Sequence, residues 1–277
     1  MQEPDKGRWS LPERLDAVVL GGGDNRGALR EASAEPYEAL IPVGNEPMIA
    51  HVAAALSRAR RIGSIVCVGP PAVLAAAAQA LDRRGQGQRL VPSEAGRSLL
   101  ENLERGLAQA RTPYVVVVTS DIPLVGGHMV DDFVARCEQA PQAQDVWYAV
   151  VERSVGEARY PGVRRTWIRL ADGTFTGGNL AVVERGIVER TRRLLERAIE
   201  GRKSPLALAR LLGAGALWRF LWGRLTMAEA EQRVGRILGI RGRAVVTPYP
   251  EIGIDVDKPA DLLLARRHLA PHRGGAG

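Results

Sequence analysis

Short apolar runs alternate with amphipathic segments along the first 120 residues of the chain. The runs suit buried strands, whereas the segments between them place apolar residues at helical spacing, as Ile49, Val52 and Leu56 do. The predicted strands span 15–20, 64–68, 89–91 and 114–118, and the predicted helices span about 47–61, 70–84 and 99–110. This alternation predicts an α/β fold with a doubly wound, mostly parallel sheet between two layers of helices.

The pattern changes after residue 121. Residues 164–170 alternate charged and apolar side chains, which favours an antiparallel strand with one face in water. Strands are predicted at 146–151, 164–170, 180–183, 243–247 and 252–256, and helices at 127–137, 187–199, 206–212, 216–225, 228–238 and 258–269. We therefore expect a mixed sheet in a single domain over 15–270, preceded by a flexible leader (1–14) and followed by a disordered tail (271–277).

The most informative stretch is 114–125, Y-V-V-V-V-T-S-D-I-P-L-V. Four valines predict a strand buried on both faces, and Pro123 prevents that strand from continuing. Asp121 is then expected at the carboxyl end of a central strand, where open α/β sheets bind their ligands. The alternative is that Asp121 caps the following helix.

The first predicted strand runs directly into Gly21, Gly22 and Gly23. Consecutive glycines let backbone N–H groups approach a ligand closely, and phosphate or a base edge is the usual guest. The turn is neither a G-x-G-x-x-G fingerprint nor a P-loop, because no G-K-[ST] follows.

Composition adds two constraints. The net charge is +7, and the segment 185–243 holds fourteen Lys/Arg against five Glu, which indicates either an anionic partner or a solvated basic surface. Cys67 and Cys137 have no metal-ligand spacing and are interpreted as buried thiols in a reducing compartment. No signal peptide and no apolar stretch of membrane-spanning length occurs, so a cytoplasmic location is expected.

Five motifs together resemble one family. They read V-V-L-G-G-G at 18–23, A-L-I-P-V-G-N-E-P-M-I at 39–49, V-T-S-D-I-P at 118–123, T-G-G-N-L at 176–180 and I-D-V-D-K-P-A-D-L at 254–262. In order and spacing they resemble the MobA-like NTP transferases, the nucleotidyltransferases of the molybdenum-cofactor guanylyltransferase type. The resemblance implies the GT-A, Rossmann-like nucleotide-diphosphosugar transferase fold. The helical segment 185–241 is larger than the family core requires and is interpreted as an insertion.

The resemblance also implies an activity: a Mg²⁺-dependent nucleotidyltransferase moves an NMP from an NTP, CTP or GTP, to a phosphorylated small molecule and releases pyrophosphate. Mg²⁺ prefers carboxylate oxygens, so two aspartates from distant strand ends would suit it. The implied roles are base and phosphate binding by Leu20, Gly21, Gly22 and Gly23, phosphate contacts by Arg26 or Arg30, proximity to the base for Ser98 and Asn102, Mg²⁺ binding and catalysis by Asp121 and Asp255, and acceptor binding by Gly178 and Asn179. For Asp255 and Asp257, a turn and a helix cap before Pro259 are the alternative.

One residue departs from the family pattern. Where the family carries a lysine before its P-x-x-G-x-P-M-I segment, this chain has Glu38, a reversed charge that would repel a triphosphate. Either another cation substitutes, such as Arg30 or one from the basic segment, or Glu38 is neutralised by Arg26 or Arg30, or the protein binds nucleotide poorly. A non-catalytic nucleotide- or sugar-phosphate-binding protein on the same scaffold is therefore the competing hypothesis. No nucleic-acid-binding motif is present, and no nucleic-acid partner is expected.

The basic segment also carries an apolar cluster, formed by Trp218, Phe220, Leu221 and Trp222. Aromatic residues at helical spacing favour packing in the core. Contact with a membrane surface, beside the neighbouring arginines, is the alternative. The sequence makes no prediction about the oligomeric state.

Overall fold

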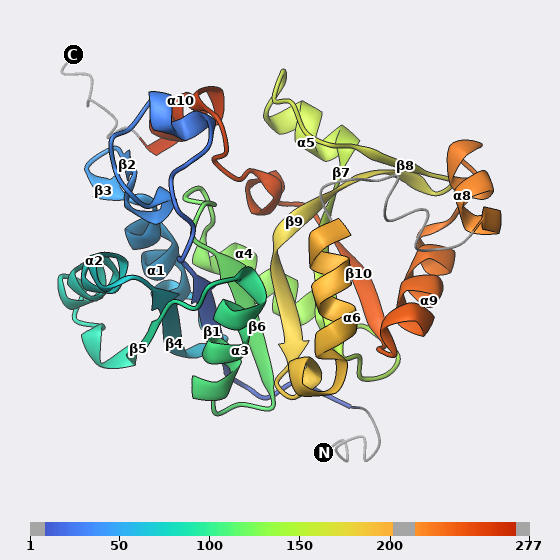
Figure 1. Cartoon of the computed structure of the whole chain (residues 1–277), viewed down its shortest axis with the longest axis horizontal. Helices are drawn as coiled ribbons and strands as arrows, with labels where there is room; N and C mark the ends of the chain where they lie inside the picture. The colour runs from blue at the N-terminus through green and yellow to red at the C-terminus, as the bar shows by residue number, and fades with distance from the viewer. Residues whose placement is uncertain (1–8, 202–213, 270–277) are drawn as a thin grey trace, which may run out of the picture.

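A computed structural model describes residues 9–201 and 214–269 of the chain. Its centre is an eight-stranded sheet in the order β10-β7-β9-β6-β1-β4-β5, with β8 paired to β9 (Figure 1). The strands are β1 (Leu15–Leu20), β4 (Ile62–Gly69), β5 (Leu90–Glu94), β6 (Tyr114–Thr119), β7 (Val146–Glu152), β8 (Ile168–Leu170), β9 (Gly173–Glu184) and β10 (Gly242–Thr247). β9 runs antiparallel to both β6 and β7, whereas β1, β4, β5 and β6 are mutually parallel, which confirms the predicted mixed, mostly parallel sheet.

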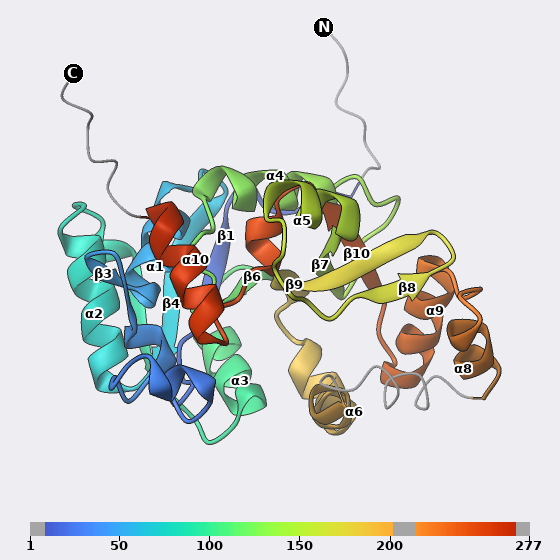
Figure 2. The same ribbon diagram turned by 90° about the horizontal axis from the view of Figure 1, so that it is seen from above.

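Helices cover both faces of this sheet. One face carries α1, α2 and α4, whose apolar residues join the largest core cluster, and the other face carries α3 and α6. Figure 2 shows α4 on one side of the strands and α3 and α6 on the other. The helices are α1 (Met48–Arg58), α2 (Pro71–Asp82), α3 (Leu99–Gln109), α4 (Gly127–Cys137), α5 (Arg153–Arg159), α6 (Ile187–Gly201), α8 (Ala214–Leu221), α9 (Met227–Leu238) and α10 (Pro259–Leu269).

The last helix returns to the beginning of the chain. α10 packs on a short 3-10 helix, Ala28–Glu31, and on the small hairpin of β2 (Pro42–Val43) and β3 (Glu46–Pro47). Apolar side chains of both segments form a separate buried cluster around Met48 and Leu262. The segment 28–47 and the last helix thus close over the same end of the sheet, as the adjacent blue and red ribbons show (Figure 1).

Several predicted elements need correction. The expected strand at 252–256 is wrong: Pro250–Gly253 forms a 3-10 helix, because Ile252 packs in the main core while Val256 packs against α10. β8 covers only the end of the expected strand 164–170, and β9 begins before the predicted 180–183. The expected helix 206–212 and tail 271–277 lie outside the described residues.

The leader is anchored from Trp9 onward. The Trp9 ring stacks on Trp147 with centroids 5.1 Å apart, and its Nε1 donates to the Ala140 carbonyl oxygen at 2.8 Å. Leu11 is buried. The expectation of a flexible leader is therefore wrong for residues 9–14, because these apolar side chains complete the core beside β7.

The apolar cluster of the basic segment divides between two environments. Phe220 packs with Leu225 and Val150 against β8, β9 and α9, as predicted. The prediction of core packing is wrong for Trp218, Leu221 and Trp222, whose side chains are exposed. None of the described helices is long and apolar enough to cross a membrane.

Candidate active site

Three sequence motifs meet at one edge of the sheet. β1 and β6 are parallel neighbours, with Leu20 opposite Thr119. β9 runs antiparallel to β6, with Leu180 opposite Val118. The glycine turn after β1, Asp121 after β6 and the T-G-G-N segment of β9 therefore lie side by side, at the carboxyl edge where open α/β sheets bind ligands.

Asp121, Asp255 and Asp257 form a cluster of carboxylates at this edge. One carboxylate oxygen from each lies within 4.8 Å of the others. The segment 254–257 is held against β6 because the Val256 N–H donates to the Asp121 carbonyl oxygen at 2.9 Å. The predicted convergence of Asp121 and Asp255 agrees with this arrangement, whereas the sequence suggested only a turn or a cap for Asp257. Their binding of a metal stays a prediction.

Capping of the following helix does not explain the position of Asp121. α4 begins at Gly127 with Gly126, not Asp121, at its N-cap. At the start of α10, the carboxylate of Asp261 accepts hydrogen bonds from the Lys258 N–H at 3.1 Å and the Asp257 N–H at 3.4 Å. The carboxylates of the cluster are thus placed at the sheet edge without a capping role for Asp121.

Burial dominates the electrostatics of Asp121. Loss of water raises the pKa of this carboxyl above its ordinary value, and the charge of Asp257 raises it further. The Thr119 hydroxyl donates to the Asp121 carboxylate and opposes that rise in pKa. Three carboxylates this close repel one another, so the cluster is suited to a cation.

Arg165 supplies a positive charge that the sequence pattern did not reveal. Its guanidinium donates from one terminal nitrogen to the Asp255 carboxylate and from the other to the Asp255 carbonyl oxygen at 3.0 Å. The side chain is only 12% exposed, and its Nε–H is buried without a hydrogen-bond partner among the described residues. Burial lowers the pKa of Arg165, and the charges of Asp261, Asp257 and Asp121 oppose that shift.

The glycine turn is closely packed on its inner side. A Cβ at position 22 would lie 2.5 Å from Nδ2 of Asn102 and 3.3 Å from Cβ of Ala95. Asn102 is buried, and its Oδ1 accepts the Gly96 N–H at 2.6 Å. Gly22 and Asn102, predicted separately to lie near the nucleotide, are therefore direct neighbours, and only glycine leaves room for this amide.

Glu38 lies at the outer side of the same turn. Its N–H donates to the Gly23 carbonyl oxygen at 3.1 Å, and a Cβ at position 23 would lie 3.3 Å from its Oε2. The reversed charge identified in the sequence thus stands directly beside the predicted phosphate-binding turn.

The other predicted nucleotide residues have local partners. Arg26 forms an ion pair with Asp24 at 2.9 Å. Arg30 donates to the carbonyl oxygens of Ala34 at 2.9 Å and Glu35 at 3.2 Å. Both arginines are exposed.

Ser98 is also engaged locally, as the N-cap of α3. Its Oγ accepts the Glu101 N–H at 3.1 Å, and the side chain is exposed. Its predicted proximity to the base stays a prediction.

The T-G-G-N segment lies at an irregularity between β7 and β9. The pairing register shifts between Tyr148 and Val150, so Gly178 and Asn179 fall outside the regular ladder. A Cβ on Gly178 would lie 2.9 Å from Ile252, so close packing already explains a glycine here. Asn179 directly precedes Leu180, which pairs with Val118 near the end of β6, so it lies at the same edge of the sheet. Its role in acceptor binding stays a prediction.

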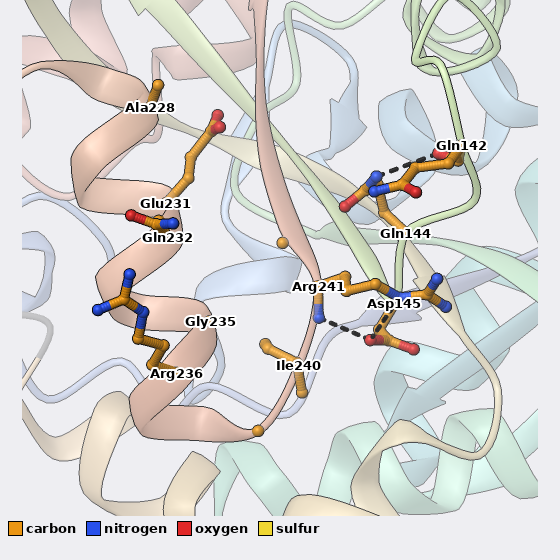
Figure 3. A pocket seen from close by; sticks show the side chains of 12 residues that line it. Gln142, Gln144, Asp145, Ala228, Glu231, Gln232, Gly235, Arg236, Ile240 and Arg241 are labelled. Carbon is orange, nitrogen blue, oxygen red and sulfur yellow. Dashed lines mark hydrogen bonds and ion pairs between the residues drawn. The ribbon is translucent and has the colours of Figure 1, made fainter.

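A large open groove lies elsewhere. It has a volume of about 570 Å³ and lies between α9, β10 and the loop before β7 (Figure 3). Glu231, Gln232 and Arg236 line it from α9, and Asp145 and Arg241 from the other side. Its strand residues stand at the start of β10, so the groove lies at the edge of the sheet opposite to the carboxylates.

Comparisons with known proteins agree with the observed fold. The MobA-like NTP transferase domain family matches residues 17–217. A hypothetical transferase from Thermus thermophilus is similar over 90% of this chain and 99% of its own, with 39% sequence identity and a TM-score of 0.74. Among curated proteins, none matches this chain.

More distant structures share the fold. A CMP:2-keto-3-deoxy-manno-octonic acid synthetase in complex with CTP covers 91% of this chain and 97% of its own, with 16% identity and a TM-score of 0.54. A 4-diphosphocytidyl-2C-methyl-D-erythritol synthase from Anaerococcus prevotii covers 93% of this chain and 96% of its own, with 9% identity and a TM-score of 0.55. This chain therefore belongs to the family of MobA-like NTP transferase domains and is a nucleotidyltransferase of that family.

Proposed function

We propose that this protein transfers an NMP from an NTP to a phosphorylated small molecule, with Mg²⁺ as cofactor and pyrophosphate as the second product. The observation that carries the proposal is the carboxylate cluster of Asp121, Asp255 and Asp257 beside the glycine turn. Carboxylate oxygens are hard ligands of the kind that Mg²⁺ prefers in proteins, so the donor set fits this ion.

In this proposal the protein acts mainly by positioning and charge neutralisation. Backbone N–H groups of Gly22 and Gly23 would bind the nucleotide, whereas the Gly21 N–H, also predicted for this role, already donates to the Val68 carbonyl oxygen at 2.8 Å. Asp121 and Asp255 would hold the Mg²⁺. An oxygen of the acceptor phosphate attacks the α-phosphorus of the NTP, and the bond to pyrophosphate breaks. The acceptor phosphate is already anionic, so no strong general base is needed. Bound Mg²⁺ would offset the negative charge of the triphosphate and of the leaving pyrophosphate.

The structural neighbours favour a pyrimidine nucleotide. One of them was determined in complex with CTP, and another is a diphosphocytidyl synthase. We therefore favour CTP over GTP as the nucleotide of this protein. The acceptor would bind at the β9 side of the edge, near Gly178 and Asn179.

A non-catalytic nucleotide-binding protein is the competing proposal, and one observation favours it. The Glu38 carboxylate stands beside Gly23, where a triphosphate would meet a like charge. Both proposals predict NTP binding, whereas only the first predicts release of pyrophosphate.

The test combines binding with turnover. Thermal unfolding is measured with each NTP and Mg²⁺, since a ligand that binds the native state raises its stability. Pyrophosphate release is then measured with the stabilising NTP and a panel of sugar and polyol phosphates. Asp121→Asn should abolish the Mg²⁺-dependent stabilisation, and Asp132→Asn, in a surface ion pair on α4, is the matched control.

Release of pyrophosphate by the wild type and its loss in Asp121→Asn would support the transferase. Binding without release for every acceptor would favour the non-catalytic alternative. Equal Mg²⁺-dependent binding by Asp121→Asn and wild type would contradict the assignment of Asp121 to the metal.

A further inference from the structure

α8 presents an apolar face to solvent. Trp218, Leu221 and Trp222 are 61%, 63% and 63% exposed, and their spacing places them on one side of the helix. The rings of the two tryptophans lie with centroids 5.3 Å apart. Phe220 points the other way, into the cluster formed with Leu225 and Leu170. The helix is thus fixed to the protein by one side and leaves the other largely exposed.

The position of α8 makes this face accessible. In both views α8 stands at the outer end of the molecule, next to α9 and β8 and far from α2 at the opposite end (Figures 1 and 2). None of its residues belongs to the candidate active site, so the proposed transferase reaction does not account for the exposed tryptophans.

Two exposed arginines lie beside this apolar face, although the exposed Asp172 carboxylate also lies nearby, where it accepts the Met227 N–H at 3.0 Å. Arg169 of β8 is exposed, and its Nε would lie 3.6 Å from a Cβ at Gly223, directly after α8. Arg224 is exposed, and no carboxylate pairs with Arg169 or Arg224 within residues 9–201 and 214–269. Arg219 is the exception, since it forms an ion pair with Glu229 at 2.9 Å.

Tryptophans flanked by arginines fit the boundary between lipid and water. Tryptophan has an apolar body and a polar N–H, and it is enriched where membranes meet water. Arginines beside an apolar helix face are attracted to anionic lipid head groups. A second copy of this chain fits less well, because a two-fold contact through α8 would bring the same arginines together and place like charges face to face.

We propose that this α8 surface, formed by Trp218, Leu221, Trp222, Arg169 and Arg224, is a docking site for an anionic phospholipid bilayer. The apolar side chains insert at the level of the head groups, and the arginines bind their phosphates. The proposal is independent of the transferase activity, because it rests on residues outside the candidate active site.

Vesicle co-sedimentation tests this proposal. The full chain is mixed with vesicles of phosphatidylcholine alone or with an equal amount of phosphatidylglycerol, at low and at high salt. We expect partition onto the anionic vesicles and its weakening by salt. Trp218→Ser/Trp222→Ser should reduce the partition coefficient at least about tenfold. Arg224→Gln should reduce it about fivefold, the effect of one cation near an anionic surface.

Two further measurements distinguish docking through α8 from adsorption by any exposed apolar side chain. Leu263→Ser removes such a side chain on α10 and should leave partition unchanged. Acrylamide quenching of tryptophan fluorescence should decrease on binding, because the α8 tryptophans leave the water. Lack of partition by the wild type, or equal partition by the double tryptophan variant, overturns the proposal. A wild-type dimer in sedimentation velocity that the double variant dissociates also overturns it, in favour of a second copy.

Discussion

Arg165→Met offers a direct measurement of the charge balance at the carboxylate cluster. In the wild type, the guanidinium of Arg165 touches Asp255, and carboxylate oxygens of Asp121, Asp255 and Asp257 lie within 4.8 Å of one another. Methionine keeps much of the length of the arginine side chain but removes its charge. The variant therefore leaves three neighbouring carboxylates without their buried cation.

The distances set the expected magnitude. Arg165 is in hydrogen-bond contact with Asp255, and opposite unit charges about 4 Å apart attract by about 4 kcal/mol at an effective dielectric constant of 20. The Asp255 side chain is 23% exposed, so water screens part of this energy. We expect the free energy of unfolding to fall by about 2–3 kcal/mol, less than the roughly 3–5 kcal/mol of a fully buried pair that loses one partner, because water reaches Asp255.

Urea unfolding in EDTA provides the assay. Arg165→Met, Asp255→Asn and the double variant form a thermodynamic cycle whose coupling energy should be about 1–3 kcal/mol. Excess Mg²⁺ should then stabilise Arg165→Met more than the wild type, because the ion replaces the missing charge. Arg61→Met is the control, since Arg61 pairs with Glu138 at 2.7 Å on a distant surface and should not respond to Mg²⁺.

Two results would refute this reasoning separately. A coupling energy near zero would mean that the Arg165–Asp255 contact contributes nothing to stability, whether or not the cluster binds a metal. A normal coupling energy together with equal Mg²⁺ effects on the Arg165 and Arg61 variants would leave the ion pair intact and reject the metal site.

Three further outcomes follow from the structure. Glu38→Lys should tighten NTP binding about tenfold in isothermal titration by removing a repulsion beside the glycine turn. Weaker binding would mean that a nearby arginine neutralises Glu38, and unchanged binding would mean that this loop lies away from the nucleotide. Gly22→Ala should lower the free energy of unfolding by about 1–3 kcal/mol because its Cβ has no room, whereas Gly27→Ala, with no atom within 4 Å, should be nearly neutral in the same urea titration. A hydrogen bond from Arg84 lowers the pKa of Glu46, so Glu46 stabilises the fold at neutral pH. Glu46→Gln should therefore be less stable than wild type at pH 7, and the difference should shrink as the pH falls below about 4, a trend that parallel curves would contradict.

The parts of the fold that the sequence predicted well are those whose pattern is local. β1 matches its predicted strand, and α4 its predicted helix, at both ends. Each is a continuous segment, one within the sheet and one packed on it, so its apolar pattern and the flanking glycines are enough to predict its ends. The strand predicted at 252–256 was wrong because its apolar residues do not share one face of a sheet. Ile252 and Val256 belong to two separate apolar clusters.

The candidate site also contains residues that the sequence predicted and one that it did not. Asp121 could be predicted at the ligand-binding edge because it follows a central strand. The family resemblance implied that Asp255 joins it, although Asp255 follows a 3-10 helix and not the expected strand. Arg165 could not be predicted, because its segment resembled an ordinary strand with one wet face and its contact with Asp255 spans 90 residues. Long-range contacts of one polar side chain leave no periodic signal, so they emerge only from the packed structure.

The charges at the site edge are arranged differently from what the family resemblance implied. Beside the glycine turn, Glu38 stands at the position where the family carries a lysine. The neighbouring Arg26 pairs with Asp24. A buried positive charge instead stands on the aspartate side, where Arg165 touches Asp255 and stays protonated at neutral pH. A triphosphate that spans this edge would meet repulsion near Gly23 and attraction near Arg165. For this reason we expect Glu38→Lys, which adds positive charge, to raise nucleotide affinity. Arg165→Met, which removes a positive charge, should lower it.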